Sequence, residues 1–443
     1  MRLFRQLYLT RRTFRIGWVL VLLLAIGWLW RPVFVLGKLA LLFFAIAICA
    51  ELYMLYGRRT GITAARRTLE RWSNGDINPV TLIIRSNYAL EMRIRVLDEL
   101  PFQFQERGLV FHAKLPAWST VDLEYNVRPV QRGVYVHGAI QVFVSSVLGL
   151  VERRFSEDAA REVAVYPSYL QLRKYELLAI SDRLTLAGIK KVRHVAQHAE
   201  FERIREYIPG DDRRTVNWKA TARRGRMMVN QYQDESAQQV FSLIDTGRVM
   251  KMPFDGLSLL DHAINASLVI SSIAMHKEDK AGIITFSDKV HDVLPPSRQK
   301  GQMQAILQLL YAQQTGHKET DFERAYIAVR RHIHQRSLLL LFTNYESVTA
   351  LKRQLPYLQR IARQHLLIPI FFINTELEDE LALRPRNTEE VYIRTTVEKM
   401  MYEKKLIARE LQRQGMPAIL CRPQDLTVSV IDRYLELKAR GKL

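Results

Sequence analysis

The sequence predicts a multidomain fold: an N-terminal transmembrane helical hairpin, a β-sandwich, and a C-terminal α/β domain with a doubly wound, mostly parallel sheet. Three observations predict it. Two apolar runs lie near the N-terminus, short alternating runs fill the middle, and apolar runs alternate with helical patterns from Gln239 onward. A chain of 443 residues is also too long for one ordinary core.

The changes of pattern place the domain boundaries. We expect the hairpin over 1–57, a juxtamembrane linker over 58–79, the sandwich over 80–175, a connecting segment over 176–237, and the α/β domain over 238–443. The formal charge is +20, from 65 Lys and Arg against 45 Asp and Glu. Such a balance suits a nucleic acid, an anionic membrane face or an acidic partner protein. The two cysteines, Cys49 and Cys421, do not demand an oxidising compartment.

The N-terminal apolar runs predict two helices over about 14–30 and 33–56, separated by Arg31-Pro32. At about 1.5 Å per residue the second run reaches roughly 36 Å, which is enough to span a bilayer. The first run, taken alone, has the length of a signal-peptide core. Because no small-x-small cleavage site follows it and a second apolar run does, we expect a retained hairpin.

Basic residues predict the topology of this hairpin. Five arginines precede the first run and five follow the second: Arg2, Arg5, Arg11, Arg12 and Arg15, then Arg58, Arg59, Arg66, Arg67 and Arg71. The positive-inside rule then places both termini in the cytoplasm. Lys38 and Glu51 lie near opposite ends of the second run, where Lys38 can snorkel and Glu51 approaches the cytoplasmic face. We interpret the hairpin as an anchor rather than as a proton relay.

Short alternating runs predict the strands of the sandwich, and turn residues such as Arg132-Gly133 and His137-Gly138 separate them. The runs cover residues 81–84, 92–96, 121–125 and 134–136. Strands at such close, regular spacing are typical of a β-sandwich.

The C-terminal part predicts a parallel sheet covered by helices. Strands are expected over 240–244, 281–286, 338–342, 366–373 and 418–421. Helices are expected over 257–276, 301–311, 322–335, 345–364, 397–414 and 426–440. Ligands of such sheets lie at the carboxyl ends of the strands, which here present Asp245, Asp288, Thr343-Asn344 and Asn374.

Residues 205–224 predict a turn followed by a short basic helix. Pro209 and Gly210 fit the central pair of a type II turn, because Gly supplies the positive φ. Asp211 or Asp212 can cap the helix that follows. The helix would carry apolar residues inside and end at a glycine: Val216, Trp218, Ala222 and Gly225.

The same stretch resembles the signature of the bacterial "domain of unknown function fifty-eight" family, in which every fixed position is filled. These positions are Arg205, Tyr207, Pro209, Gly210, Asp211, Arg214, Asn217, Trp218, Lys219 and Arg223. The resemblance implies that the α/β domain is von Willebrand A-like. It also implies a MoxR-type AAA+ ATPase as partner, chaperone-like or complex-assembly activity, and a multi-pass protein of the bacterial inner (cytoplasmic) membrane.

A von Willebrand A domain implies a metal-ion-dependent adhesion site, in which an Asp-x-Ser-x-Ser loop, a Thr and an Asp hold Mg²⁺. This chain departs from that pattern. Gly247 and Val249 replace the serines, and Asn344 replaces the acidic ligand. Only Asp245 and Thr320 remain, so the implied metal site is degenerate.

Two interpretations of this edge stay open. Asp245 and Thr320 could still bind Mg²⁺, although the positive charge of Arg248 disfavours a divalent cation there. Otherwise no cofactor is needed, and Arg248 and Asn344, with the neighbouring Thr343, bind a carboxylate of a partner directly.

The basic signature helix also allows more than one interpretation. No aromatic row, helix-turn-helix or zinc spacing supports nucleic-acid binding. The alternatives are a structural corner between the sandwich and the α/β domain, and a docking surface for an acidic partner. Trp218 is predicted to lie in a core rather than in a contact surface, because apolar residues recur at helical spacing.

No catalytic motif is found: there is no Gly-x-Ser-x-Gly elbow, Walker loop or His-Glu-x-x-His pattern. Together with what the family resemblance implies, this favours a membrane-anchored, non-catalytic adaptor with a cytoplasmic α/β head. The alternative is an envelope-associated enzyme or enzyme regulator, such as a cell-wall hydrolase accessory. That alternative needs the head outside the membrane, which the arginine distribution opposes.

Overall fold

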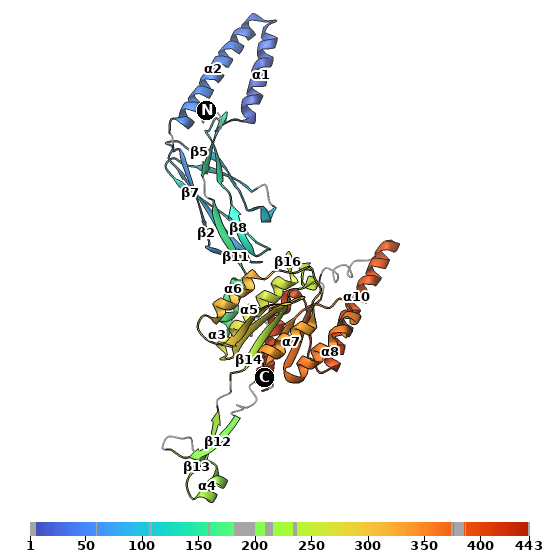
Figure 1. Ribbon diagram of the computed structural model, residues 1–443. Helices are drawn as coiled ribbons and strands as arrows, with labels where there is room; N and C mark the ends of the chain where they lie inside the picture. The colour runs from blue at the N-terminus through green and yellow to red at the C-terminus, as the bar shows by residue number, and fades with distance from the viewer. Residues whose placement is uncertain are drawn as a thin grey trace. The chain divides into compact units, whose positions relative to one another are not determined.

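The computed structural model divides into two compact units, Met1–Tyr166 and Pro167–Leu443 (Figure 1). It describes residues 6–58, 60–105, 109–157, 160–180, 200–208, 216–233, 237–373, 375, 385 and 387–441. The unit boundary falls nine residues before the expected end of the sandwich at 175. The reason is α3 (Tyr169–Ile180), whose Leu172 and Tyr175 pack against the core of the second unit.

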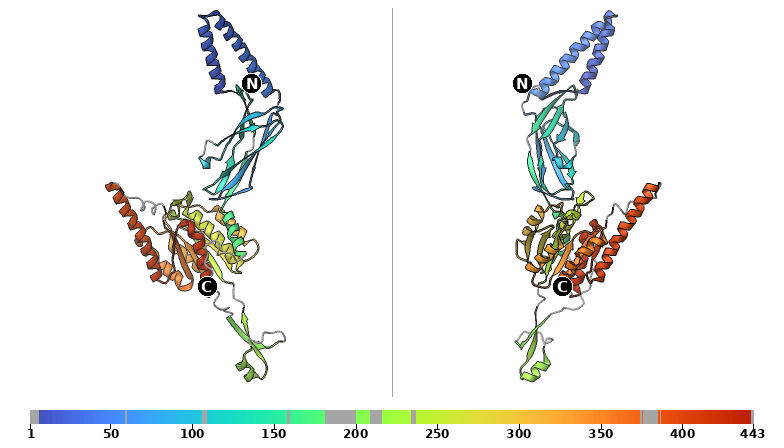
Figure 2. Two further views of the ribbon diagram at one scale, coloured as in Figure 1. Left: turned by 180° about the vertical axis from the view of Figure 1, so that it is seen from behind. Right: turned by 45° about the vertical axis from the view of Figure 1, so that its right-hand side comes forward.

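Two helices form the N-terminal hairpin, α1 (Arg11–Gly27) and α2 (Arg31–Tyr56), which lie side by side (Figure 2). The first helix ends before the expected residue 30, because residues 28–30 make the turn. Gly27 permits that turn, since a Cβ there would lie 2.7 Å from the Cα of Phe34. Within the described ranges, α2 is the one helix long and apolar enough to cross a membrane, with a mean hydropathy of 2.6.

The rest of the first unit is β-rich and encloses one core. Its sheets have the strand orders β1-β10-β9-β5-β6, β2-β4-β7 and β3-β11-β8. The strands are β1 (Leu7–Leu9), β2 (Ile62–Thr68), β3 (Arg71–Ser73), β4 (Asn78–Ser86), β5 (Met92–Asp98), β6 (Val110–Leu115), β7 (Thr120–Val127), β8 (Gly133–His137), β9 (Ile140–Ser145), β10 (Val151–Glu157) and β11 (Arg161–Tyr166). Buried side chains from these sheets, among them Trp72, Ile84 and Val142, form the shared core.

The segment expected to be a linker, 58–79, is instead part of this unit, because it contains β2, β3 and the start of β4. Its arginines were expected to mark a cytoplasmic flank. Arg66, however, is buried in an ion pair with Asp98, with side chains 2% and 0% exposed. An internal carboxylate satisfies that charge, so Arg66 does not serve as a topology signal.

The second unit contains a six-stranded sheet of order β18-β17-β14-β19-β20-β21, parallel except for β18. The strands are β14 (Gln239–Asp245), β17 (Lys280–Phe286), β18 (Val290–Ser297), β19 (Leu338–Phe342), β20 (Leu366–Phe372) and β21 (Ile419–Cys421). The helices are α5 (Leu259–His276), α6 (Gln302–Ala312), α7 (Phe322–His332), α8 (Val348–Gln364), α10 (Thr388–Arg413) and α11 (Leu426–Ala439). The expected strands and helices of this region are present within about three residues of the predicted bounds, except that α10 begins at Thr388, nine residues before the predicted 397.

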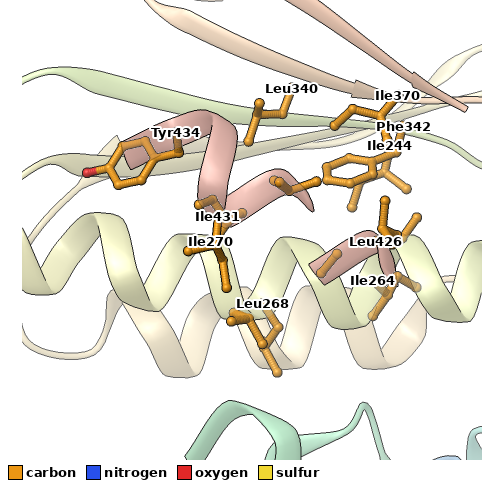
Figure 3. Close-up of a cluster of buried hydrophobic side chains, with 14 of the residues drawn as sticks. Ile244, Ile264, Leu268, Ile270, Leu340, Phe342, Ile370, Leu426, Ile431 and Tyr434 are labelled. Carbon is orange, nitrogen blue, oxygen red and sulfur yellow. The ribbon is translucent and has the colours of Figure 1, made fainter. Parts of the chain in front are cut away.

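Alternate side chains of the central strand β14 pack into two hydrophobic cores, one on each face of the sheet. Val240 and Ile244 join α5, α6 and α11 on one face, as Figure 3 shows for Ile244. Phe241 and Leu243 join α7, α8 and α10 on the other face. Burial on both faces explains why β14 carries adjacent apolar residues instead of alternating polar and apolar ones. The antiparallel edge strand β18 was not expected, because its sequence contains His291, Asp292 and a Pro-Pro pair and only its pairing with β17 makes it a strand.

Candidate functional site

The strand order of the α/β unit reverses at β14. The chain passes from β14 to β17 on one side, and later to β19 on the other. Open α/β sheets bind ligands at such a switch point, beyond the carboxyl ends of the strands. Asp245 ends β14 and Thr343 follows β19, so this point brings the two residues together.

Asp245 is fully buried and is surrounded by donors. Its Oδ1 accepts hydrogen bonds from the Thr320 hydroxyl at 2.6 Å and from the Gly247 N–H at 2.8 Å. Its Oδ2 accepts one from the Thr343 hydroxyl at 2.7 Å. Burial raises the pKa of Asp245, and these three hydrogen bonds oppose the rise. The predicted metal pair, Asp245 and Thr320, therefore does meet, with Thr343 as a third member.

Gly247 stands where a metal-binding loop would carry its first serine, and the structure explains the glycine. A Cβ at this position would lie 2.1 Å from the Thr320 hydroxyl oxygen and 3.0 Å from Asp245 Oδ1. The Thr320 hydroxyl thus occupies the space that a serine side chain would need. The glycine at 247 and the hydrogen bond from Thr320 to Asp245 therefore depend on each other, because a side chain at 247 would displace the Thr320 hydroxyl.

We expect Gly247→Ser to destabilise the protein by about 2 kcal/mol, because it overpacks the Thr320–Asp245 contact. Denaturant midpoints of the full-length protein measure the change. Gly316→Ser is the matched control, since a Cβ there meets its nearest atom at 3.6 Å. Equal midpoints for the two variants would show that the loop around Gly247 is not closed as described.

The remaining predicted residues lie around this cluster. Asn344 is buried, and its Oδ1 accepts a hydrogen bond from the Lys404 ammonium, which also donates to the Tyr345 carbonyl. Burial lowers the pKa of Lys404 to about 8. Arg248 is exposed and lies 3.7 Å from Glu319. Asn344 therefore has an internal cationic partner, whereas Arg248 lies at the rim in an exposed ion pair with Glu319.

A small cavity of about 60 Å³ opens beside the cluster. Two of its lining groups, the Tyr345 hydroxyl and Gln354 Oε1, are buried without a hydrogen-bond partner in the described structure. The lining residues are Asp245, Arg248, Val249, Glu319, Thr320, Phe322, Thr343, Asn344, Tyr345, Glu346, Ala350, Arg353 and Gln354. The cavity has room for a side-chain tip or a few water molecules. Sequence reasoning missed Tyr345, Arg353 and Lys404, because no motif links them to Asp245.

These residues fit Mg²⁺ poorly. Mg²⁺ requires six well-placed oxygens. Both oxygens of Asp245 already accept hydrogen bonds, and the oxygen of Asn344 is bound to a lysine. No group of three or more His, Cys, Asp or Glu side chains suited to a metal ion occurs among the described residues.

A second polar cluster follows the neighbouring strand β17. The Ser287 hydroxyl lies 2.7 Å from His291 Nε2, a distance that suits a nucleophile and its base. Asp288 Oδ1, however, accepts a hydrogen bond from Ser287 itself and does not orient the histidine. Asp288 also pairs with Lys318 at 2.7 Å, and this hydrogen bond lowers its pKa to about 2.

The signature region forms a strand pair, β12 (Glu200–Glu206) and β13 (Met228–Gln233), with the short helix α4 (Trp218–Arg224) between them. Asn217, rather than Asp211 or Asp212, caps α4 by accepting from the Ala220 N–H at 3.0 Å. Its amide also donates to Asn230 at 2.8 Å, which ties the cap to β13. Gly225 ends the helix with a φ of 68°, as predicted.

Trp218 was predicted to lie in a core, and this is wrong: its side chain is 71% exposed. The helix is too short to bury an apolar face within the described region, so the indole stays on its surface. Lys219, Arg223, Arg224 and Arg226 are exposed on the same segment. Ile204, Ile208 and Met227, which lie nine or more residues from Trp218 in the sequence, are also exposed. We call Trp218, Lys219, Arg223 and Arg224 the signature surface.

Other signature residues have local roles or lie elsewhere. Arg205 donates to the Glu206 carbonyl at 3.0 Å, and the Tyr207 N–H donates to the Met227 carbonyl at 2.9 Å. The predicted turn and the remaining positions, Pro209, Gly210, Asp211 and Arg214, lie outside the described residues. So does Asn374, which was expected at a strand end.

Comparison with known proteins gives a family match and distant relatives. Residues 203–398 match the family model "Protein of unknown function DUF58". The "Uncharacterized protein YeaD" of Bacillus subtilis (strain 168) is 24% identical over 211 residues, which is 46% of this chain and 52% of that protein. The chain thus spans about half the length of this curated relative.

Solved structures resemble the chain only weakly. The conserved hypothetical protein BatB from Bacteroides thetaiotaomicron covers 46% of this chain and 100% of its own, with 12% identity and a TM-score of 0.29. The CARDB domain of PF1109 from Pyrococcus furiosus covers 24% of this chain and 91% of its own, with 16% identity and a TM-score of 0.18. Neither likeness carries a functional argument.

Proposed function

We propose, on the premise that this chain belongs to the DUF58 family of proteins of unknown function, that it is a membrane-anchored, non-catalytic adaptor. In this proposal a von Willebrand A-like α/β head lies in the cytoplasm and works with a MoxR-type AAA+ ATPase in chaperone-like or complex-assembly activity. In this proposal the head works without a metal ion, and the protein donors that bond Asp245 support this.

The observation that carries this proposal is the signature surface. An exposed tryptophan beside cationic side chains is the composition typical of binding hot spots, where Trp and Arg are enriched. Residues 216–233, which contain α4 and β13, hold one Lys, three Arg and no Asp or Glu. An acidic surface of a partner protein complements both features.

The anchor in this proposal is the hairpin of α1 and α2. The hydropathy of α2 supports one span. We propose that α1 forms a second span, which places both termini on the cytoplasmic side of the inner membrane of a bacterium. The exposed arginines 11, 12, 15 and 58 at the open end of the hairpin support this orientation.

Substitution of the signature surface is expected to abolish capture of the ATPase. The tagged, detergent-solubilised protein is used to pull down partners from its native host, with and without a non-hydrolysable ATP analogue, and a MoxR-type ATPase is identified by mass spectrometry. Trp218→Ala with Arg223→Glu should reduce recovery of the ATPase at least about tenfold, the loss of one hot-spot contact. Tyr392→Ala is the matched control, because its ring is 75% exposed in α10. Equal recovery with all variants would overturn the proposed docking surface.

The Ser287–His291 pair favours one second candidate, an envelope-associated hydrolase or hydrolase accessory. This candidate requires the head outside the membrane. A reporter fused at Leu443 that is active only in the cytoplasm would exclude it. Labelling by a serine-reactive fluorophosphonate that Ser287→Ala abolishes would support it.

A further inference from the structure

The turn between β9 and β10 exposes two adjacent apolar side chains at the base of the hairpin. Val147 is 62% exposed and Leu148 is 51% exposed. Both flanking residues, Ser146 and Gly149, are buried. A turn tip of two large aliphatic residues is unusual for a surface that faces only water, because turns favour Gly, Pro, Asn, Asp and Ser.

The turn is fixed to α2 through Glu51. This carboxylate is fully buried and accepts hydrogen bonds from the Ser146 hydroxyl and from the N–H groups of Gly149, Leu150 and Val151. The three N–H contacts measure 2.9–3.1 Å. Glu51 was expected to sit near the membrane interface as a flanking charge, whereas it joins the helix to the β-rich region.

The other side of the turn is fixed to the start of α1. The Thr10 N–H donates to the Leu150 carbonyl at 3.1 Å, and the Thr10 hydroxyl donates to the Gly149 carbonyl at 2.7 Å. The Thr13 hydroxyl also donates to the Leu150 carbonyl. Both helices therefore hold the turn at a defined height along the hairpin.

That height is set by helix length. At about 1.5 Å per residue, α2 extends about 30 Å from Glu51 to Arg31, and α1 extends about 21 Å from Thr13 to Gly27. The hydrocarbon core of a bilayer is about 30 Å thick. If the hairpin spans it, the part of α2 above Glu51 only just suffices and that of α1 falls short. The turn must then lie at the boundary between hydrocarbon and headgroups.

Arg12 lies beside the turn, and Arg58 and Trp118 lie just past the end of α2, on the side of the turn away from the hydrocarbon. Arg12 is exposed and lies beside Gly149: if Gly149 carried a Cβ, that atom would lie 3.6 Å from Arg12 Nη1. Trp118 is 57% exposed and stacks under the Arg58 guanidinium, 4.4 Å from the ring centroid. Tryptophan and arginine are enriched where protein meets headgroups, and arginine favours anionic ones.

We propose that the Val147–Leu148 turn inserts into the membrane interface and forms a third membrane contact beside the two helices. Anionic headgroups contact the arginines around it. The proposal rests on the membrane anchoring proposed above. Its consequence is that the β-rich region is held against the bilayer surface in one orientation rather than tethered at a distance from it.

Fluorescent labelling of the full-length protein in vesicles tests this inference. Single cysteines are placed at Leu148, at Leu22 in α1 and at Val134 in β8, in a background without Cys49 and Cys421, and labelled with the polarity-sensitive dye NBD. Leu22 and Val134 are 61% and 48% exposed, so both labels are tolerated. The vesicles are phosphatidylcholine with phosphatidylglycerol and carry quenchers at shallow or deep acyl positions.

We expect the Leu148 label to show blue-shifted emission and stronger quenching by the shallow quencher than by the deep one. The Leu22 label should respond to lipid quenchers, and the Val134 label only to aqueous iodide. An aqueous Leu148 label with a lipid-embedded Leu22 label would overturn the inference and leave the anchor intact. If the Leu22 label is aqueous as well, the anchoring itself is refuted.

Discussion

Replacing Glu51 by alanine is expected to destabilise the N-terminal unit by about 4 kcal/mol. The change leaves the N–H groups of Gly149, Leu150 and Val151 and the hydroxyl of Ser146 without their acceptor. Each buried donor that loses its partner costs about 1–3 kcal/mol, and the four do not add fully because the turn relaxes.

The expected result is a lower thermal midpoint in detergent and faster proteolysis within residues 146–151. Glu51→Gln should fall between wild type and alanine, because its amide keeps one acceptor oxygen but loses the charge. Glu70→Ala is the matched control, since Glu70 is an exposed carboxylate between β2 and β3. If Glu51→Ala and Glu70→Ala have the same thermal midpoint, Glu51 of α2 does not hold the turn at residues 146–151.

Replacing Asp245 by alanine is expected to destabilise the α/β unit by about 3 kcal/mol. The change orphans the Thr320 and Thr343 hydroxyls and the Gly247 N–H, and it opens a hole at the ends of β14 and β19. Denaturant midpoints measure it. Glu319→Ala is the control, because this carboxylate adjoins Thr320 but its side chain is 71% exposed. A change no larger than that of the control would contradict the described cluster.

Asparagine at position 245 is expected to behave differently, with a defined pH dependence. Burial raises the folded-state pKa of Asp245 above its unfolded value of about 3.9. Below that value both states are protonated. As pH rises, the unfolded state ionises first, so wild type loses stability relative to Asp245→Asn until the folded pKa is passed.

Midpoints of wild type and Asp245→Asn between about pH 4 and pH 8 test this sign. Other titrating groups cancel in the difference between the two proteins. We expect the stability of Asp245→Asn, measured by its denaturant midpoint, to increase relative to that of wild type as pH rises. A difference that stays constant, or that favours wild type at higher pH, would show that the hydrogen bonds from Thr320, Gly247 and Thr343 outweigh burial.

The sequence predicted the α/β sheet well because every central strand is buried on both faces. Leu338–Phe342 is apolar throughout and Val240–Ile244 is apolar except for Ser242, and this pattern needs no tertiary information to be found. The edge strand β18 was missed for the converse reason. It is polar and contains prolines, and its conformation depends on pairing with β17.

The candidate site divides in the same way. Asp245 and Thr343 were predicted because strand ends of a parallel sheet converge at one edge. Thr320 was predicted only from the resemblance to a von Willebrand A domain. Lys404 was not, since it reaches Asn344 from a helix 60 positions along the chain. Trp218 was misplaced because helical spacing indicates one face of a helix but not whether anything covers that face.

The sequence by itself therefore determined the apolar segments, the sheet and the signature positions, since these follow from local periodicity and turn chemistry. Only the tertiary structure decided which polar groups are paired. It placed Glu51 against the turn at 146–151, Arg66 against Asp98 and the Thr320 hydroxyl in the space beside Gly247. The physical reason is that a buried charge must find a partner, and that partner lies wherever the packed chain brings one, at any distance along the sequence.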